Sequence, residues 1–343
     1  MARDPSADIA SASAPRVGKL GGSSFFGRKP LGARAVNSLP LPISFPGGAK
    51  AAILLTFDVE GRYGNGAGDE TVEIANYRRI ADRLNRLGLK ATFNIVGEMA
   101  EQKGSDFVRW LHDAGSEIAS HGYWHEMNRF GDYTYHGQYG FEENLDSLRR
   151  SREILSTITG CPTRGVRIPY AHANEFTYQA IIEAGFDWCS HWGIDDMMDA
   201  SQGFGPTLFQ PALGDTTYNL VEIPLDTQTY DWSIWMADEN NASFIERVRR
   251  YCESRKISFK RTPSGGVDIW MSRVEETMRQ GGVFSLLCHP INLAVRDPRW
   301  GDPLEEFLFP VFERLAALKN AGAILVPTCG EMAGFYRQRQ ARV

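Results

Sequence analysis

Short apolar runs alternate with longer segments in which apolar residues recur every three or four positions. The short runs are typical of strands buried on both faces, and the longer segments are typical of amphipathic helices. The pattern predicts eight strands, at about residues 51–58, 91–96, 117–121, 165–169, 187–192, 220–224, 283–289 and 323–327. Helices are expected at about residues 71–88, 105–115, 141–158, 175–184, 243–251, 268–280 and 304–320, and a last helix closes the chain.

This alternation predicts an α/β fold with a parallel sheet inside and helices outside. Over 343 residues, a closed (β/α) barrel of seven or eight parallel strands is favoured over a doubly wound sheet. The first strand–helix turn has no Gly-x-Gly-x-x-Gly sequence, which argues against a dinucleotide-binding domain.

The chain divides into two parts. Residues 1–45 are rich in Ala, Ser, Gly, Pro and Arg without periodicity, which predicts a flexible or loosely wrapped arm. Residues 46–340 form the predicted catalytic barrel. The arm lacks the apolar segment of a secretory signal, and its apolar residues could instead cover a subunit interface.

Composition excludes several classes of protein. The formal net charge is −5 without a long basic cluster, which argues against nucleic-acid binding. The longest apolar runs are too short to predict a membrane span. The five cysteines are scattered without Cys-x-x-Cys spacing, so a reduced, cytoplasmic protein is expected. Cys288 precedes His289, but its apolar flanks favour a packed thiol over a nucleophile.

Two carboxylates end the first predicted strand. Asp58 and Glu60 follow the apolar run that starts at Ala51, and Gly61 comes next. An unpaired carboxylate is costly to bury, so these acids predict either a metal site or a proton transfer. The alternative is that they are two loop acids that cap the next helix. Because residues two apart in a strand share a face, both acids can point into one site.

Other polar residues follow other predicted strands. His121 and His125 lie four residues apart, and with one acid they supply the ligand number of an open catalytic metal site. The alternative is a pair of exposed loop histidines. In barrels the reactive side chains gather at the carboxyl ends of the strands, so these residues should converge with Asp58 and Glu60.

Two further residues are expected at the same end of the barrel. Arg167 could hold a carboxylate ionised and oriented, although a surface arginine before a Pro-bounded loop is the alternative. His289 could serve as a general acid, or it could be a neutral, hydrogen-bonded core histidine.

Four motifs in order resemble those of the polysaccharide deacetylase family, the carbohydrate esterases with the NodB homology domain. The resemblance covers roughly residues 50–335. The family's Thr-Phe-Asp-Asp-Gly resembles residues 56–61, His-x-x-x-His resembles 121–125, Arg-x-Pro-Tyr resembles 167–170 and Leu-x-His resembles 287–289. The resemblance implies a distorted barrel of the NodB type.

The resemblance also implies roles for individual residues. Asp58 would be the general base, His289 the general acid, and Arg167 would orient Asp58. Glu60, His121 and His125 would bind one divalent metal ion per chain, with zinc as the expected ion. The chain departs from the family at Val59, where the second acid usually lies; Glu60 comes one residue later. This acid-x-acid pattern is similar to that of an intracellular peptidoglycan-deacetylase-like and allantoinase-like subgroup.

Aromatic residues in the loops are candidates for substrate binding, because aromatic faces suit sugar rings and other ring substrates. The alternative is that they fill seams between loops and helices. The residues predicted to bind substrate are Tyr63, Trp124, Tyr170 and Trp192.

The resulting hypothesis is a metal-dependent hydrolase of a non-peptide amide bond. An N-acetylated amino sugar or a related small molecule is its expected substrate. One alternative is a metal-independent, allantoinase-like hydrolase of cyclic amides or ureides, and another is a catalytically silent carbohydrate-binding protein. The resemblance further implies a homo-oligomer, and no nucleic-acid or membrane partner is expected.

Overall fold

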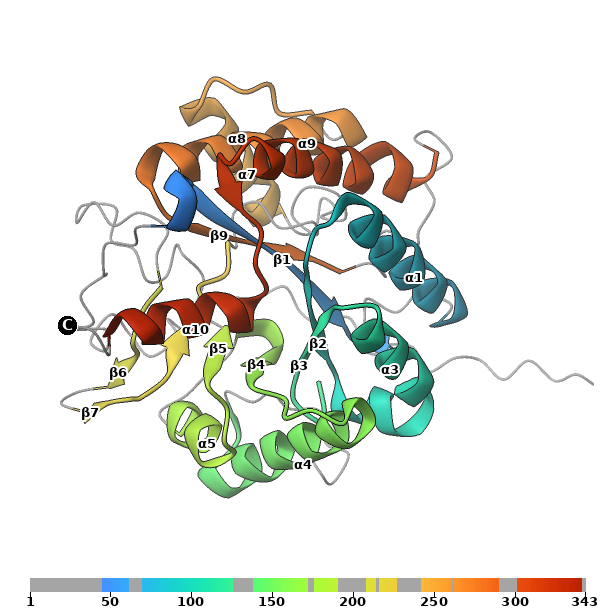
Figure 1. Cartoon of the computed structure of the whole chain (residues 1–343), viewed down its shortest axis with the longest axis vertical. Coiled ribbons are helices and arrows are strands. Elements are labelled where there is room, and N and C mark those ends of the chain that lie inside the picture. The colour runs from blue at the N-terminus through green and yellow to red at the C-terminus, as the bar shows by residue number, and fades with distance from the viewer. Residues whose placement is uncertain are drawn as a thin grey trace, which may run out of the picture.

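A curved sheet of eight parallel strands forms the centre of the molecule (Figure 1). The computed structural model describes residues 45–61, 70–125, 138–171, 176–190, 208–213, 216–226, 242–260, 262–289 and 301–340. Its strands are β1 (Ala51–Val59), β2 (Thr92–Ile95), β3 (Glu117–Ser120), β4 (Gly165–Arg167), β5 (Trp188–Ser190), β8 (Val221–Glu222), β9 (Val283–Cys288) and β10 (Ile324–Leu325). Each corresponds to a predicted strand, so the α/β fold of the distorted NodB barrel type is confirmed. The closed form that was expected is not seen, because within the described residues β8 pairs with neither β9 nor β10 and the sheet is an open half-barrel.

Strand β1 is the axis of the sheet because it pairs with three other strands. Ala52 pairs with Val283 of β9 and with Leu325 of β10, so these strands lie on opposite edges of β1. Near the other end of β1, Thr56 pairs with β9 and with β2. From β2 the sheet continues through β3, β4 and β5 to β8. The four strands β1, β2, β3 and β4 therefore bring their carboxyl ends to one end of the sheet.

Helices cover the outer face of the sheet in two groups (Figure 1). One large apolar core joins β1, β2 and β9 to α1 (Glu70–Leu87), α3 (Ser105–Asp113), α7 (Ala242–Ser254), α8 (Pro263–Gln280) and α9 (Phe309–Asn320). A second core joins β4 and β5 to α4 (Phe141–Thr159) and α5 (Thr177–Glu183). Helix α10 (Cys329–Gln340) instead packs against the inner face, in a third core.

Alternation along β1 separates the core from the site. Ile53, Leu55, Phe57 and Val59 belong to the outer core, whereas Ala52 and Leu54 belong to the core on the inner face. With a side-chain period of two, Asp58 continues the inner row toward the carboxyl end of the sheet.

Some elements differ from the predictions. Helix α8 begins at Pro263 rather than at about 268, because the Thr262 side chain accepts a hydrogen bond from the N–H of Gly265 and caps the helix. The predicted helix at 304–320 consists of a π-helical turn (Leu304–Leu308) followed by α9. A short antiparallel pair, β6 (Ala212–Leu213) and β7 (Thr216–Thr217), and the short helix α2 (Gly97–Met99) were not predicted.

Other predictions concern features beyond the fold. Residues 1–44 of the predicted arm lie outside the described residues, so the arm stays a prediction, as do the homo-oligomer and the cytoplasmic location. Among the described helices, none combines the length and the apolar character needed to cross a membrane. Cys288 is fully buried in the outer core, as expected of a packed thiol.

Candidate active site

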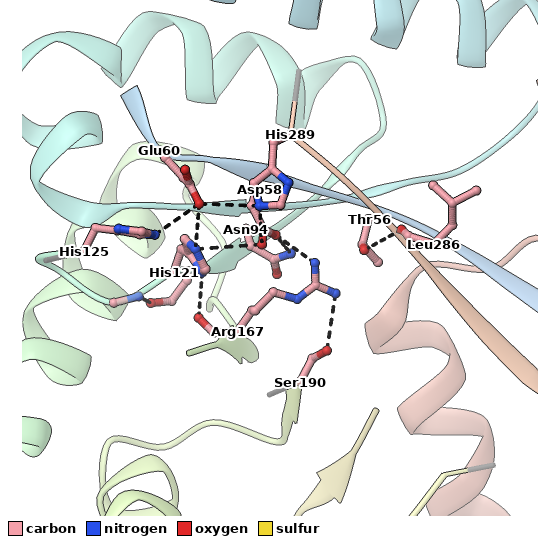
Figure 2. A network of polar contacts seen from close by, with 12 residues as sticks. Thr56, Asp58, Glu60, Asn94, His121, His125, Arg167, Ser190, Leu286 and His289 are labelled. Carbon is pink, nitrogen blue, oxygen red and sulfur yellow. Dashed lines mark hydrogen bonds and ion pairs between the residues drawn. The ribbon is translucent and has the colours of Figure 1, made fainter. Parts of the chain in front are cut away.

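Six polar side chains converge at the carboxyl end of the sheet (Figure 2). They come from β1 and the residue after it, from the segment after β3, from the end of β4 and from the residue after β9. They are the side chains expected to converge there, namely Asp58, Glu60, His121, His125, Arg167 and His289. All except His289 have side chains that are about nine-tenths buried or more.

Asp58 has two different oxygens. Its Oδ1 accepts hydrogen bonds from Nη1 of Arg167 at 2.7 Å and from Nδ2 of Asn94 at 2.8 Å. Its Oδ2 lies 3.8 Å from Nε2 of His121 and 3.8 Å from Nε2 of His289. One oxygen is thus held by donors, and the other faces the histidines.

The charges of the site keep both acids ionised. Burial alone would raise the pKa of Asp58, but the Arg167 guanidinium, with smaller contributions from His121 and His289, lowers that pKa below its ordinary value. Burial would also raise the pKa of Glu60, but His125 and His289 hold that pKa well below its usual range. Both carboxylates are therefore available as ligands or bases at neutral pH.

Three imidazoles surround one oxygen of Glu60. Its Oε1 lies 3.1 Å from Nε2 of His125, 3.6 Å from that of His289 and 3.7 Å from that of His121. The possible ligand atoms of Glu60, His121 and His125 all lie within 4.8 Å of one another, as do those of Asp58, Glu60 and His289. The two possible ligand sets share Glu60.

The hydrogen bond of His121 suits a metal ligand. Its Nδ1 lies 2.8 Å from the backbone oxygen of Arg167, which can only accept, so Nδ1 carries the proton. In the neutral form of the ring, Nε2 then presents a lone pair, and within the described residues this buried atom has no hydrogen-bond partner. A metal-binding histidine normally donates from its other ring nitrogen in this way. Together with Glu60 and His125, His121 therefore fits a divalent metal with two nitrogen ligands and one oxygen ligand.

Backbone hydrogen bonds fix the segment that carries the two histidines. The N–H groups of Gly97 and Glu98, at the start of α2, donate to the carbonyls of Gly122 and Tyr123 at 2.9 and 3.0 Å. The N–H of Tyr123 donates to Ser147 of α4 at 3.0 Å. Gly122 has a φ of +73°, a backbone conformation that residues other than glycine rarely adopt. The spacing of His121 and His125 is thus set by a rigid turn.

The four residues predicted to bind substrate have different positions. Tyr170 is exposed, and its ring centroid lies 4.8 Å from that of His125, so it borders the site. Trp124 is buried, with its ring against Tyr123 and near the guanidinium of Arg150. Tyr63 and Trp192 lie outside the described residues. Substrate binding by all four stays a prediction.

Sequence reasoning missed two residues of the site. Asn94 donates to Asp58, and Ser190 accepts a hydrogen bond from Nη2 of Arg167 at 3.3 Å. Asn94 is a polar residue inside a mainly apolar predicted strand, which was the available signal, and Ser190 is the last residue of β5 (Trp188–Ser190). Their partners could not be identified without the pairing of the strands.

Comparisons with known proteins agree with this architecture. Residues 47–188 match the family model of the polysaccharide deacetylases. A search of curated proteins finds no match. A crystal structure of a provisionally assigned polysaccharide deacetylase from Mycobacterium smegmatis is similar, with a TM-score of 0.66, 21% identity, and coverage of 88% of this chain and 96% of that one.

Two other solved structures share the fold. Puue allantoinase has a TM-score of 0.61 at 15% identity, over 86% of this chain and 92% of that one. A probable polysaccharide deacetylase from Pseudomonas aeruginosa PAO1 has a TM-score of 0.61 at 14% identity, and the match covers 88% of this chain and 95% of that one. At these identities the similarity concerns the fold.

Proposed function

We propose that this chain is a metal-dependent N-deacetylase, because residues 47–188 match the family model of the polysaccharide deacetylases, whose members are hydrolytic deacetylases acting on carbon–nitrogen bonds. Its substrate is an acetylated amino sugar or a related small amide. The observation that carries the proposal is the arrangement of Glu60, His121 and His125 beside an ionised Asp58.

The residues divide into ligands and proton carriers. Glu60, His121 and His125 hold the metal, with zinc as the expected ion, because the tautomer of His121 directs a lone pair toward Glu60. When bound, the ion supplies Lewis-acid polarisation of the substrate carbonyl. Asp58 and His289 remain for proton transfer.

Asp58 acts as the general base through its Oδ2. That oxygen takes a proton from the attacking water, whose oxygen forms the new bond to the acetyl carbon. Arg167 keeps Asp58 ionised before the reaction and holds Oδ1 away from the water, since its guanidinium binds that oxygen at 2.7 Å.

His289 acts as the general acid. Its Nε2 lies within 4 Å of both carboxylates, and its side chain is the most exposed of the six, so it faces the incoming substrate. His289 gives a proton to the amide nitrogen as the carbon–nitrogen bond breaks. The products are acetate and a free amine, and the proton taken by Asp58 returns to solvent.

A second candidate is a metal-independent hydrolase of cyclic amides or ureides. Its support is the contact between Nε2 of His125 and Oε1 of Glu60, which at 3.1 Å lies within hydrogen-bond distance, so these two side chains can satisfy each other directly. The two candidates differ in whether the reaction requires a metal.

The experiment is a substrate screen with and without added zinc, followed by variants. We expect release of acetate from N-acetylated amino sugars, abolished by a chelator and restored by the metal. Asp58→Asn and His289→Ala should each lower kcat by roughly 10²–10⁴-fold. Glu117→Gln, which neutralises a carboxylate at the other end of the sheet, is the matched control. Its kcat should stay within about threefold of that of the unaltered protein. Hydrolysis that survives the chelator would favour the second candidate, and a full rate in Asp58→Asn would exclude Asp58 as the base.

A further inference from the structure

Asn94 lies directly opposite Asp58 in the sheet. The two residues are register partners in the parallel pairing of β1 and β2. The flanking Phe93 and Ile95 belong to the outer core, so Asn94 belongs to the inner row, and its side chain is fully buried.

Asn94 and Arg167 share one acceptor. Nδ2 of Asn94 and Nη1 of Arg167 both donate to Oδ1 of Asp58, at 2.8 and 2.7 Å (Figure 2). The donors come from strands on the same side of β1, since the sheet runs from β1 through β2 and β3 to β4. Two donors on one oxygen fix the rotation of the carboxylate, and Oδ2 is left facing His121 and His289.

We propose that Asn94 is a positioning residue that works with Arg167 to lock Oδ1 of Asp58 and to present Oδ2 to the attacking water. This inference rests on the proposed function, in which Asp58 is the base. A single donor would leave the carboxylate free to rotate about the Arg167 hydrogen bond. The second donor, on a neighbouring strand, removes that freedom without adding another cation next to the metal ligands.

The rest of the Asn94 side chain argues against a purely structural role. Its own Oδ1 is buried and, within the described residues, has no hydrogen-bond partner. A buried acceptor without a partner costs free energy, so an apolar residue of similar size would suit the interior of the sheet better. A residue that lowers stability while it orders a catalytic group is expected at a functional site.

The test compares Asn94→Leu with the unaltered protein on an N-acetylated substrate that the unaltered protein hydrolyses. Leucine keeps the branched shape of the asparagine side chain and removes the donor. A lost hydrogen bond to a charged group predicts a fall in kcat of about 10- to 100-fold. KM should stay within about threefold, and the thermal midpoint should be unchanged or higher. A structural role would instead lower the thermal midpoint and leave kcat of the folded protein unchanged.

Three further variants keep the test decisive. Asn94→Ala removes the same donor without adding apolar bulk and should show the same loss of kcat if the leucine variant does not fold. Ser285→Ala removes another buried polar atom on the sheet and should keep kcat within about twofold. In an Asp58→Asn background, adding Asn94→Leu should change the residual rate by less than about twofold, because Asn94 acts through Asp58.

The outcomes separate this inference from the proposed function. If Asp58→Asn is inactive while Asn94→Leu and Asn94→Ala keep full kcat, the positioning role is wrong and the base assignment stands. A further 10- to 100-fold loss in the double variant would also overturn it, because Asn94 would then act independently of Asp58. A full rate in Asp58→Asn would overturn both.

Discussion

The sheet carries partly or fully buried carboxylates at both of its ends, and their surroundings differ. Asp58 lies next to the last residue of β1, at the carboxyl end, and Glu117 is the first residue of β3, at the amino end. Asp58 is paired with the cation of Arg167 and with Asn94. Glu117 accepts hydrogen bonds from the hydroxyl of Thr92 at 2.7 Å and from the N–H of Gly330 at 2.9 Å.

The two environments shift the pKa values in opposite directions. Around Asp58, the positive charges outweigh burial and lower the pKa. Around Glu117, burial raises the pKa, and the hydrogen bonds from Gly330 and Thr92 offset only part of that rise. A buried acid with a cation stays charged for chemistry, whereas one with neutral donors is shifted toward its protonated form.

Glu117 has a structural task that explains its position. Gly330 lies in the first turn of α10, and the N–H of Cys329 donates to Thr92 at 2.9 Å. These contacts fasten α10 to the amino ends of β2 and β3. A Cβ at Gly330 would lie 2.2 Å from Oε1 of Glu117, so a larger residue there would force the Glu117 carboxylate to move from its present hydrogen bonds. The amino end of the sheet is therefore an anchor, and the carboxyl end is the site.

The largest effect should follow from removing the cation that distinguishes the two ends. Arg167→Met leaves the Asp58 charge buried without its main partner, so its pKa should rise toward the behaviour of Glu117. Breaking such a buried pair costs about 3–5 kcal/mol of unfolding free energy. We also expect kcat to fall by about 10²–10³-fold as the base loses charge and orientation. Chemical denaturation and steady-state kinetics measure the two effects.

Arg164→Met is the matched control for this substitution. Arg164 is a neighbouring arginine whose side chain is mostly exposed and pairs with Asp187 at 2.6 Å. An exposed pair contributes about 0–1 kcal/mol, so this variant should keep its rate and nearly all of its stability. Equal losses of kcat and of unfolding free energy in Arg167→Met and Arg164→Met would show that the cation beside Asp58 has no specific role in the site.

A smaller effect should appear when each carboxylate is neutralised in metal-free protein. At pH 7, Asp58→Asn should lower the unfolding free energy, and Glu117→Gln should leave it unchanged or raise it, following the direction of each pKa shift. The measurement is denaturant unfolding from pH 7 to pH 3.

The pH dependence of these differences follows from the direction of each shift. The lowered pKa of Asp58 gives stability that is present above the unfolded-state value of about 3.9 and is lost as the pH falls through the folded-state pKa. The raised pKa of Glu117 costs stability, and that cost is absent below about pH 4.3 and grows as the pH rises through the folded-state pKa. If both variants lowered, or both raised, the unfolding free energy at pH 7, the proposed difference between the two carboxylates would be wrong.

Much of this architecture could be predicted from the sequence. All eight strands were visible as apolar runs, because strands buried on both faces carry few polar residues. The proximity of Asp58, Glu60 and the histidines was predicted because all of them lie at or after the carboxyl ends of parallel strands. Residues two apart in a strand also share a face, which brings Asp58 and Glu60 to the same site. That period also explains why Val59 packs in the outer core while Glu60 approaches His125.

Other features depend on contacts that one sequence does not reveal. The role of Asn94 requires the register of β1 and β2, and the tautomer of His121 requires the carbonyl of Arg167, 46 residues away. The burial of Trp124 also depends on such contacts, because the sequence of a loop does not distinguish an aromatic side chain that packs in the interior from one that binds substrate. The start of α8 was predicted too late because its first turn contains Gly265 and Gly266, and glycine has a low helix propensity.

In the proposed metal site the acid is Glu60, whereas Val59 faces the outer core. The direct measurement is the metal content, by elemental analysis, of the unaltered protein, Glu60→Ala and Val59→Ala after incubation with zinc and removal of the excess. We predict about one ion per chain in the unaltered protein and in Val59→Ala, and nearly none in Glu60→Ala, which loses one of three protein ligands. A full ion in Glu60→Ala would exclude Glu60 as a ligand, and no ion in the unaltered protein would exclude the metal site.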